Sequence, residues 1–408
     1  MTAAPAPRAR ERPIVWLHSH FLLPMGGTKF VWEVARRLIE RRPLTMLVER
    51  ASDYWRERYA ESGVPLREIG GRTSTSMLYW LALPYYLRRD RDAVVRETSQ
   101  AAAIVSTYFP MNWAGNIAAA QWGIRHAHLC FEPFPFFHDH EVKASYPAPK
   151  RALLAYLSTV YGRVDRKGVL GADRLLTLNR ASAAAIERVY GRRDATPTYA
   201  GVDIEFFHPY SDAELADLRE RHGDGPLAIH STDFSPIKRT DLALRAFAAA
   251  QQSLPNGSAK LLVTSTRDDS GALAQMWELA RTLEIEDRVE FLGFVPYEDL
   301  PRYYSLADVL VQTGTASLSG ATTMSLPVKE ALACGTAVIR SDATDEDVED
   351  GISGYLIDPA NSQATGAKLA ALLGDRGRAG QMGEAGRGKI VELYRWDRVV
   401  DVVLEAVS

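Results

Sequence analysis

The sequence has little cysteine and no long apolar run, and both shortages limit what the chain can be. Only two cysteines, Cys130 and Cys334, occur among 408 residues, which excludes a disulfide-stapled scaffold and fits a reducing compartment. No Cys/His cluster has zinc-like spacing, so no metal site is predicted. No stretch approaches the roughly 18 charge-free apolar residues of a membrane span. Residues 1–12 lack the apolar core of a signal peptide and are predicted to be a disordered tail. We therefore expect a cytoplasmic protein.

Charge is nearly balanced overall but unevenly placed. The net charge is −3, yet residues 1–205 carry 29 Lys+Arg against 20 Asp+Glu, and residues 206–408 carry 19 against 31. The basic half favours an anionic partner, either an acidic acceptor or an anionic membrane surface, although an uneven solvated surface accounts for it equally well. Residues 77–91 (MLYWLALPYYLRRDR) interleave aromatic residues with arginines. Such a stretch suits either core packing or peripheral contact with the inner face of the membrane. No motif indicates nucleic-acid binding.

Short apolar runs alternate with segments of helical spacing, which is the pattern of parallel α/β sheets. Predicted strands occupy residues 14–18, 44–48, 102–106, 128–131, 175–178, 227–230, 260–264, 289–292, 309–312, 337–339 and 354–357. The pattern pauses at residues 201–210, where Pro209 and polar residues indicate a linker. We therefore predict two doubly wound α/β domains, over residues 13–205 and 206–390. In such folds ligands bind beyond the carboxyl ends of the strands.

Residues 325–335 (SLPVKEALACG) predict a short helix with a binding function. Pro327 suits the first helical position, and Gly335 suits the residue just past the helix end. Free N–H groups at a helix start bind a diphosphate well, and the two oxygens of Glu330 can accept hydrogen bonds from a ribose diol. A plain structural helix explains the same residues. The preceding loop is rich in small hydroxyl residues, namely Ser317, Ser319, Thr322, Thr323 and Ser325.

The extended run at residues 325–342 (SLPVKEALACGTAVIRSD), with DG at 350–351 and GYLI at 354–357, resembles the donor-site signature of glycosyltransferase family 4. Further stretches are similar to that family in the same order: PMGG at 24–27, GVD at 201–203, FHP at 207–209, FLGFVP at 291–296 and ADV at 307–309. The resemblance implies the GT-B fold, two Rossmann-like domains facing across a cleft, with a C-terminal helix over residues 391–408 returning to the first domain. It also implies transfer of a hexose-like sugar from a UDP- or GDP-linked donor to a hydroxyl acceptor with retention of configuration, without a metal or further cofactor.

The same resemblance assigns roles to individual residues. Glu330 matches the second acidic residue of the family's paired-glutamate motif and would hold the donor ribose. Lys238 matches the phosphate-binding lysine and would offset charge developing on the leaving diphosphate. The resemblance also implies contacts through backbone or ring groups. Gly26 and Gly27 would let the backbone approach the diphosphate and the acceptor, Phe294 and Val295 would flank the nucleobase, and the N–H groups near Ser325 and Leu326 would bind phosphate.

The chain departs from the family pattern at several positions. Thr322 stands where the family has its first glutamate, and Asp233 stands where it has a phosphate-binding arginine. Thr323 and Ser325 replace glycines of the loop before the helix, and Phe131 replaces a histidine found near the sugar in many members. These departures leave the donor sugar open, and a GT-B binding protein without transfer activity or a pseudo-glycosyl coupling enzyme stays as an alternative.

An aromatic, proline-rich loop follows the predicted strand at residues 128–131. Its sequence is FEPFPFFHDH over residues 131–140. Because loops after strands line the binding edge of such sheets, we expect it to shape an acceptor pocket with Glu132 or His138 as polar contacts, against the alternative of a packed surface loop. Glu132 and Lys238 are the candidate catalytic residues. His18 and His20 end the first predicted strand, where either a ligand contact or a structural role is open.

Overall fold

The computed structural model describes residues 12–22, 26–73, 76–138, 143–144, 147–234, 238–254, 259–265, 270–314, 326–341 and 346–408. The chain divides into two compact units, the first formed by Met1–Tyr199 together with Trp396–Ser408, the second by Ala200–Arg395. Residues 200–205, expected in the first domain, fall in the second unit, because Val202 pairs with Arg395 and its N–H donates to the Tyr394 carbonyl at 2.7 Å. The two units are described separately below.

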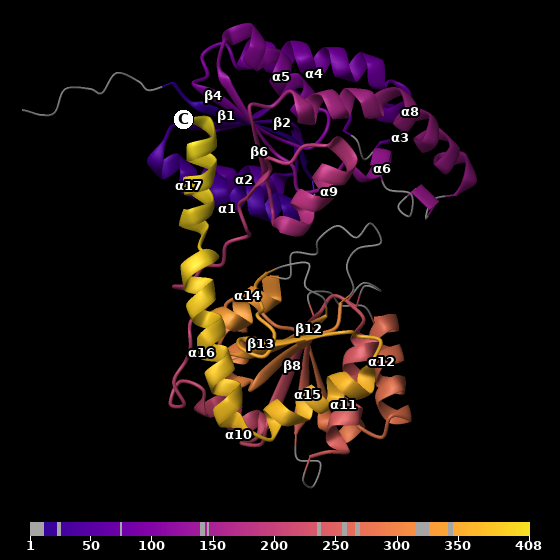
Figure 1. The fold of residues 1–408 in the computed structure, drawn as a ribbon, viewed down its shortest axis with the longest axis vertical. Coiled ribbons are helices and arrows are strands. Elements are labelled where there is room, and N and C mark those ends of the chain that lie inside the picture. The colour runs from indigo at the N-terminus through magenta and orange to yellow at the C-terminus, as the bar shows by residue number, and fades with distance from the viewer. Residues whose placement is uncertain are drawn as a thin grey trace, which may run out of the picture. The chain divides into compact units, whose positions relative to one another are not determined.

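The first unit is built on a seven-stranded parallel sheet in the order β3-β2-β1-β4-β5-β6-β7. Helices cover both faces of this sheet (Figure 1). The strands are β1 (Ile14–Phe21), β2 (Leu44–Ala51), β3 (Leu66–Glu68), β4 (Ala103–Thr107), β5 (Arg125–Leu129), β6 (Arg174–Thr177) and β7 (Thr196–Pro197). Strand β1 is almost fully buried, as a central parallel strand covered on both faces must be. The strand order reverses direction between β1 and β4, and we call this topological switch point the turning point of the sheet. In such sheets ligands bind at the carboxyl ends of the two strands that flank it.

Nine described helices surround this sheet: α1 (Gly26–Arg41), α2 (Asp53–Glu61), α3 (Met77–Leu81), α4 (Leu83–Glu97), α5 (Met111–Trp122), α6 (Pro135–His138), α8 (Ala148–Leu170), α9 (Arg180–Tyr190) and α17 (Trp396–Val407). Pro84 sits in the first turn of α4, where a missing N–H costs nothing, so the apolar stretch becomes two helices rather than one. The C-terminal helix α17 packs on α1: Trp396 meets Phe30 edge to face at 5.4 Å, and Arg41 pairs with Asp401 at 2.7 Å.

The second unit has a six-stranded parallel sheet in the order β10-β9-β8-β11-β12-β13. Its strands are β8 (Leu227–Thr232), β9 (Lys260–Ser265), β10 (Val289–Phe294), β11 (Val309–Gln312), β12 (Ala337–Ser341) and β13 (Gly354–Ile357). Its described helices are α10 (Ala216–His222), α11 (Thr240–Gln251), α12 (Ser270–Thr282), α13 (Leu300–Leu306), α14 (Leu326–Ala333), α15 (Ser362–Leu373) and α16 (Arg376–Leu393). Both sheets therefore share the doubly wound order of Rossmann-like domains, which confirms the predicted fold class.

Two carboxyl groups are buried together beneath α4 in the first unit. Glu49 of β2 and Asp90 of α4 are both fully inaccessible to solvent. The Tyr79 hydroxyl donates to Glu49 Oε1 at 3.1 Å, and Arg89 donates to Asp90 Oδ1. Burial and the neighbouring Asp90 charge raise the pKa of Glu49 well above its ordinary range. Burial also raises the pKa of Asp90, although the Arg89 charge opposes that rise, so the pair binds a proton more tightly than free carboxyl groups would.

We expect the Glu49→Gln variant to be less sensitive to alkaline pH than the wild type. The native state holds a proton that the unfolded state releases, so the stabilisation is complete below the unfolded-state pKa and is lost as pH rises through the folded-state pKa. A glutamine amide donates without titrating, so it should raise the free energy of unfolding at about pH 9 by about 1 kcal/mol or more relative to wild type. Chemical denaturation from about pH 5 to pH 9 measures this. Asp92→Asn, at an exposed carboxylate of the same helix, is the control, and equal pH profiles for wild type and Glu49→Gln would contradict the shared proton.

Candidate active site

The turning point of the second sheet lies between β8 and β11. Hydrogen bonds from hydroxyl and imidazole groups hold the ends of these strands and the start of α11 together. His230 of β8 contacts the Val311 carbonyl through Nδ1 at 2.8 Å and the Thr240 hydroxyl through Nε2 at 3.2 Å. Burial, together with the nearby positive charge of Lys238, lowers the pKa of His230 to about 4. His230 is therefore neutral at pH 7, and it joins β8 to β11 and to the start of α11.

A second group of contacts holds the segment that follows β8. The Thr232 hydroxyl lies 2.8 Å from that of Thr240 and accepts the Phe234 N–H at 2.9 Å. The Thr313 hydroxyl, after β11, donates to the Arg239 carbonyl at 2.7 Å. These bonds tie the backbone on both sides of residues 235–237, which lie outside the described residues. The half-buried Lys238 thus stands at the start of α11, at the carboxyl edge of the sheet.

Glu330 lies at the same edge, in the first turns of α14. Its side chain is buried, and Glu330 Oε2 lies 3.5 Å from the Tyr304 hydroxyl, which also lies 3.5 Å from Ser231 Oγ near the end of β8. Burial, and then the Glu330 charge, raise the pKa of Tyr304 well above its ordinary range. Tyr304 therefore stays protonated, and its hydroxyl can donate to a carboxylate. The contacts set Glu330 beside the turning point, although the residue is distant from β8 in the sequence.

The neighbouring Lys329 points into the core and anchors α14. Lys329 and Asp347 are fully buried, with Nζ 3.3 Å from Asp347 Oδ2, and Arg340 of β12 approaches Asp347 Oδ1 at 2.5 Å. The Lys329 ammonium also lies 5.4 Å from the centre of the Tyr394 ring. Two cations on one buried carboxylate hold α14 against β12 and the segment after α16. This fixes the direction in which the first N–H groups of α14 point.

In the first unit, the turning point between β1 and β4 is closed by packed rings and hydroxyls. His18 Nδ1 lies 2.5 Å from the Thr107 hydroxyl, and the His18 ring packs edge to face on Tyr108 at 5.5 Å. Burial lowers the pKa of His18 to about 3. A Cβ added to Gly27, in the first turn of α1, would lie 2.7 Å from the Tyr108 hydroxyl oxygen. Any larger residue at position 27 would therefore require the Tyr108 side chain to move.

The aromatic loop after β5 closes a small polar cavity at this edge. The cavity measures about 10 Å³, the room of one water molecule. Its polar lining comes from Tyr108, Asn112, His128, Glu132, Asp165 and Tyr190. The Cys130 thiol donates to the Glu132 carbonyl at 3.3 Å, and the Glu132 side chain is half-buried. Burial, followed by the Glu132 charge, raises the pKa of Tyr108.

Comparisons with known proteins agree with this geometry. Residues 214–389 match the family model described as glycosyl transferases group 1. The chain is 29% identical to a D-inositol 3-phosphate glycosyltransferase of Salinispora tropica, over 94% of this chain and 81% of that protein. It is 30% identical to a GDP-mannose-dependent alpha-(1-6)-phosphatidylinositol monomannoside mannosyltransferase of Mycolicibacterium smegmatis, over 64% of this chain and 65% of that protein.

Residues 214–389, which make up most of the second unit, thus carry the sequence of a glycosyl transferases group 1 domain. The fold agrees: the crystal structure of HepE from Anabaena in complex with UDP superposes with a TM-score of 0.74 at 18% identity, covering 96% of this chain and 98% of that one. The GT-B fold predicted from the sequence is thereby confirmed. The protein is a glycosyltransferase that uses a nucleotide-sugar donor. Within the described residues, no helix has the length and apolarity needed to cross a bilayer.

The structure brings part of the predicted donor set of this glycosyltransferase to one edge of the second sheet. Asp233 follows β8 directly and is half-buried, while Leu326 opens α14. Gly335 has a φ of 77°, which fits the predicted residue past the helix end. Thr322, Thr323 and Ser325 lie outside the described residues.

The two residues expected beside the nucleobase differ in exposure. Phe294 ends β10 and is 68% exposed, which leaves a ring face free for stacking, whereas Val295 is buried at 8%. Gly26 and Gly27 form the first turn of α1, without an acidic residue there.

Sequence reasoning missed Tyr108, Asn112, Asp165 and Tyr190 of the first unit. Position directly after a buried strand was an available signal for Tyr108. None was available for Asp165, since its helix α8 was not predicted.

Proposed function

We propose that this glycosyltransferase moves a hexose from a UDP- or GDP-linked donor to a hydroxyl group of a polyol phosphate or lipid-linked sugar, with retention of configuration. The observation that carries the proposal is the buried Glu330 beside Tyr304 at the turning point between β8 and β11. In doubly wound sheets this is where a nucleotide docks. A carboxylate held there accepts two hydrogen bonds from a ribose diol, which gives the nucleotide a fixed orientation.

The remaining donor roles follow from position. Lys238, at the start of α11, would place its ammonium on the diphosphate and stabilise the charge that develops as the bond to the sugar breaks. The first N–H groups of α14, from Leu326 onward, would bind phosphate oxygens with the help of the helix dipole. Phe294 would stack on the base. Thr322, in place of the family's glutamate, and Asp233 would shape the contacts to the sugar.

The acceptor would bind at the carboxyl edge of the first sheet. Gly26 and Gly27 open α1 there, and Glu132 is the acidic group beside the cavity. The two relatives are named for an inositol phosphate and a phosphatidylinositol mannoside, which share a hydroxyl-rich ring carrying a phosphate. The excess of basic residues over residues 1–205 suits such an anionic acceptor.

Peripheral contact with a membrane is part of this proposal. Leu78, Leu81 and Tyr85 on α3 and α4 are 53%, 62% and 64% exposed, and Arg88 beside them is exposed as well. Apolar side chains flanked by arginine suit the boundary of an anionic bilayer. The contact would bring a lipid-linked acceptor to the first unit without a membrane span.

We expect UDP or GDP, but not both equally, to raise the melting temperature of the protein, because a ligand that binds only the folded state stabilises it. The matching nucleotide sugar should then support transfer to D-inositol 3-phosphate or to phosphatidylinositol in vesicles, with retention read by NMR of the product. Transfer confined to vesicles, together with sedimentation on them, would identify a lipid acceptor. No thermal shift with any nucleoside diphosphate, and no transfer, would reject the proposal in favour of a binding protein.

A further inference from the structure

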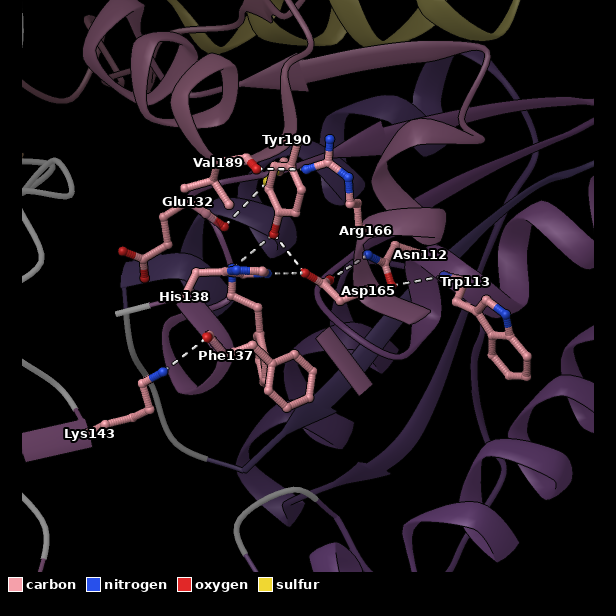
Figure 2. A network of polar contacts seen from close by, with 12 residues as sticks. Asn112, Trp113, Glu132, Phe137, His138, Lys143, Asp165, Arg166, Val189 and Tyr190 are labelled. Carbon is pink, nitrogen blue, oxygen red and sulfur yellow. Dashed lines mark hydrogen bonds and ion pairs between the residues drawn. The ribbon is translucent and has the colours of Figure 1, made fainter. Parts of the chain in front are cut away.

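A buried carboxylate near the C-terminal end of α8 receives hydrogen bonds from three other helices (Figure 2). Asn112 Nδ2 of α5 donates to Asp165 Oδ1 at 3.0 Å. His138 Nε2 of α6 and the Tyr190 hydroxyl of α9 lie 2.9 Å and 2.7 Å from Asp165 Oδ2. The Asp165 side chain is 2% exposed, so these donors replace the water that an ionised carboxylate needs.

Two of these bonds hold the loop over residues 131–138. His138 is the last residue of α6 and of this loop, and the Phe134 N–H donates to the Tyr190 hydroxyl at 3.3 Å. Figure 2 shows His138 and Tyr190 converging on Asp165 from one side and Asn112 from the other. The loop also buries Phe137 in the aromatic cluster under α3 and α4. The position of the loop therefore depends on one carboxylate distant in the sequence.

The helix is shaped to admit this network. A Cβ added to Gly168, one turn after Asp165, would lie 2.6 Å from Asn112 Cγ, inside the space that Asn112 occupies. A glycine within a helix costs about 1 kcal/mol relative to alanine. The sequence of α8 therefore gives up helix stability in exchange for the room that Asn112 needs to reach Asp165. A loosely packed surface cluster of polar side chains would not require a glycine at this position.

We propose that Asp165 is a positioning residue for acceptor recognition, because through His138 and Tyr190 it holds the 131–138 loop, and with it Glu132, at the binding edge of the first sheet. The inference rests on the proposed function, in which this loop contacts the acceptor. Because Nε2 is directed to the Asp165 carboxylate at 2.9 Å, Nδ1 is the ring nitrogen of His138 that can contact an acceptor. A hydroxyl-rich acceptor such as an inositol ring provides hydrogen-bonding groups for Nδ1 and donors for the Glu132 carboxylate.

The test combines hydrogen exchange with kinetics in the full-length protein. Asp165→Asn and Tyr190→Phe preserve side-chain size, and Asn116→Ala is the matched control. Asn116 also lies on α5, where its amide donates to the α8 carbonyls of Lys167 and Gly168 and its Oδ1 contacts His126 of β5, but none of these bonds involves residues 131–138. We expect faster amide exchange over residues 131–138 in both network variants. The KM for D-inositol 3-phosphate, or for phosphatidylinositol in vesicles, should rise about tenfold, with donor KM within twofold of wild type.

Each outcome decides one part of the inference. Unchanged exchange over residues 131–138 in Asp165→Asn overturns the anchoring of the loop. Faster exchange with an unchanged acceptor KM, or with donor and acceptor KM raised equally, overturns the role in acceptor recognition. If the wild type transfers to neither acceptor and binds no nucleoside diphosphate, the proposed function fails and the acceptor role fails with it, while the exchange data still decide the anchoring. Asn116→Ala should change neither quantity.

Discussion

Alanine in place of Glu330 is expected to weaken nucleoside diphosphate binding by about 1.5–3 kcal/mol, or roughly 10- to 150-fold in Kd. The carboxylate is buried beside Tyr304, so its charge is poorly screened and its hydrogen bonds to a ribose diol count strongly. Calorimetric titration with the nucleotide identified in the thermal-shift panel measures the loss directly.

Two further variants separate binding from packing. Glu330→Gln keeps the shape and one acceptor oxygen, and we expect it to lose less affinity than the alanine variant. Tyr304→Phe removes the hydroxyl 3.5 Å from Glu330 Oε2 while preserving the ring, so it should change nucleotide affinity only slightly. Chemical denaturation of each variant reports any loss of stability. Wild-type affinity in a folded Glu330→Ala protein would remove Glu330 from the donor site.

The strands were predictable because their signals are local. Short apolar runs placed all eleven predicted strands within about three residues of observed strands, while the short edge strands β3 and β7 were not predicted. The strand expected at residues 128–131 is shifted toward the C-terminus relative to β5 (Arg125–Leu129). Strand β5 begins with Arg125 and His126, so its start has little apolar signal in the sequence. Cys130 and Phe131 extend the apolar run beyond its end. Hydrophobicity thus led us to include Phe131, the first residue of the aromatic loop, in the predicted strand.

Several helices of the first unit were not predicted, for a different physical reason. Helix α5 is apolar around most of its circumference, and α8 mixes apolar and charged residues without a clear stripe, so neither shows the one-sided periodicity that identifies a helix.

The residues of the candidate site likewise differ in whether a local sequence signal identifies them. Glu330 and Lys238 lie in short motifs that the family resemblance identifies. The Asp165 network joins residues 53, 27 and 25 positions away, and such pairing is visible only once the fold brings α5, α6, α8 and α9 together.

Alanine in place of Lys238 is expected to lower kcat by about 10²–10³ with little change in the free energy of unfolding. The side chain is half-buried at the start of α11, so its loss leaves no large cavity. Steady-state and single-turnover kinetics separate donor binding from the chemical step. Arg239→Ala is the matched control, because it removes a neighbouring cation whose guanidinium is paired with Asp241 at 2.9 Å. Equal losses in the two variants would show a general effect of charge rather than a phosphate contact.

The size of this effect follows from the charges around the diphosphate. In the proposed donor site, Asp233 replaces the phosphate-binding arginine expected from the family resemblance, so Lys238 is the remaining cation of that pair. The second half of the chain carries 19 Lys+Arg against 31 Asp+Glu, which offers a dianionic leaving group little general attraction. A contact that strengthens as the sugar–phosphate bond breaks acts mainly on kcat, whereas uniform attraction acts on KM. We therefore expect Lys238→Ala to lower kcat far more than it raises the donor KM, and a variant with the reverse pattern would place the lysine in ground-state binding alone.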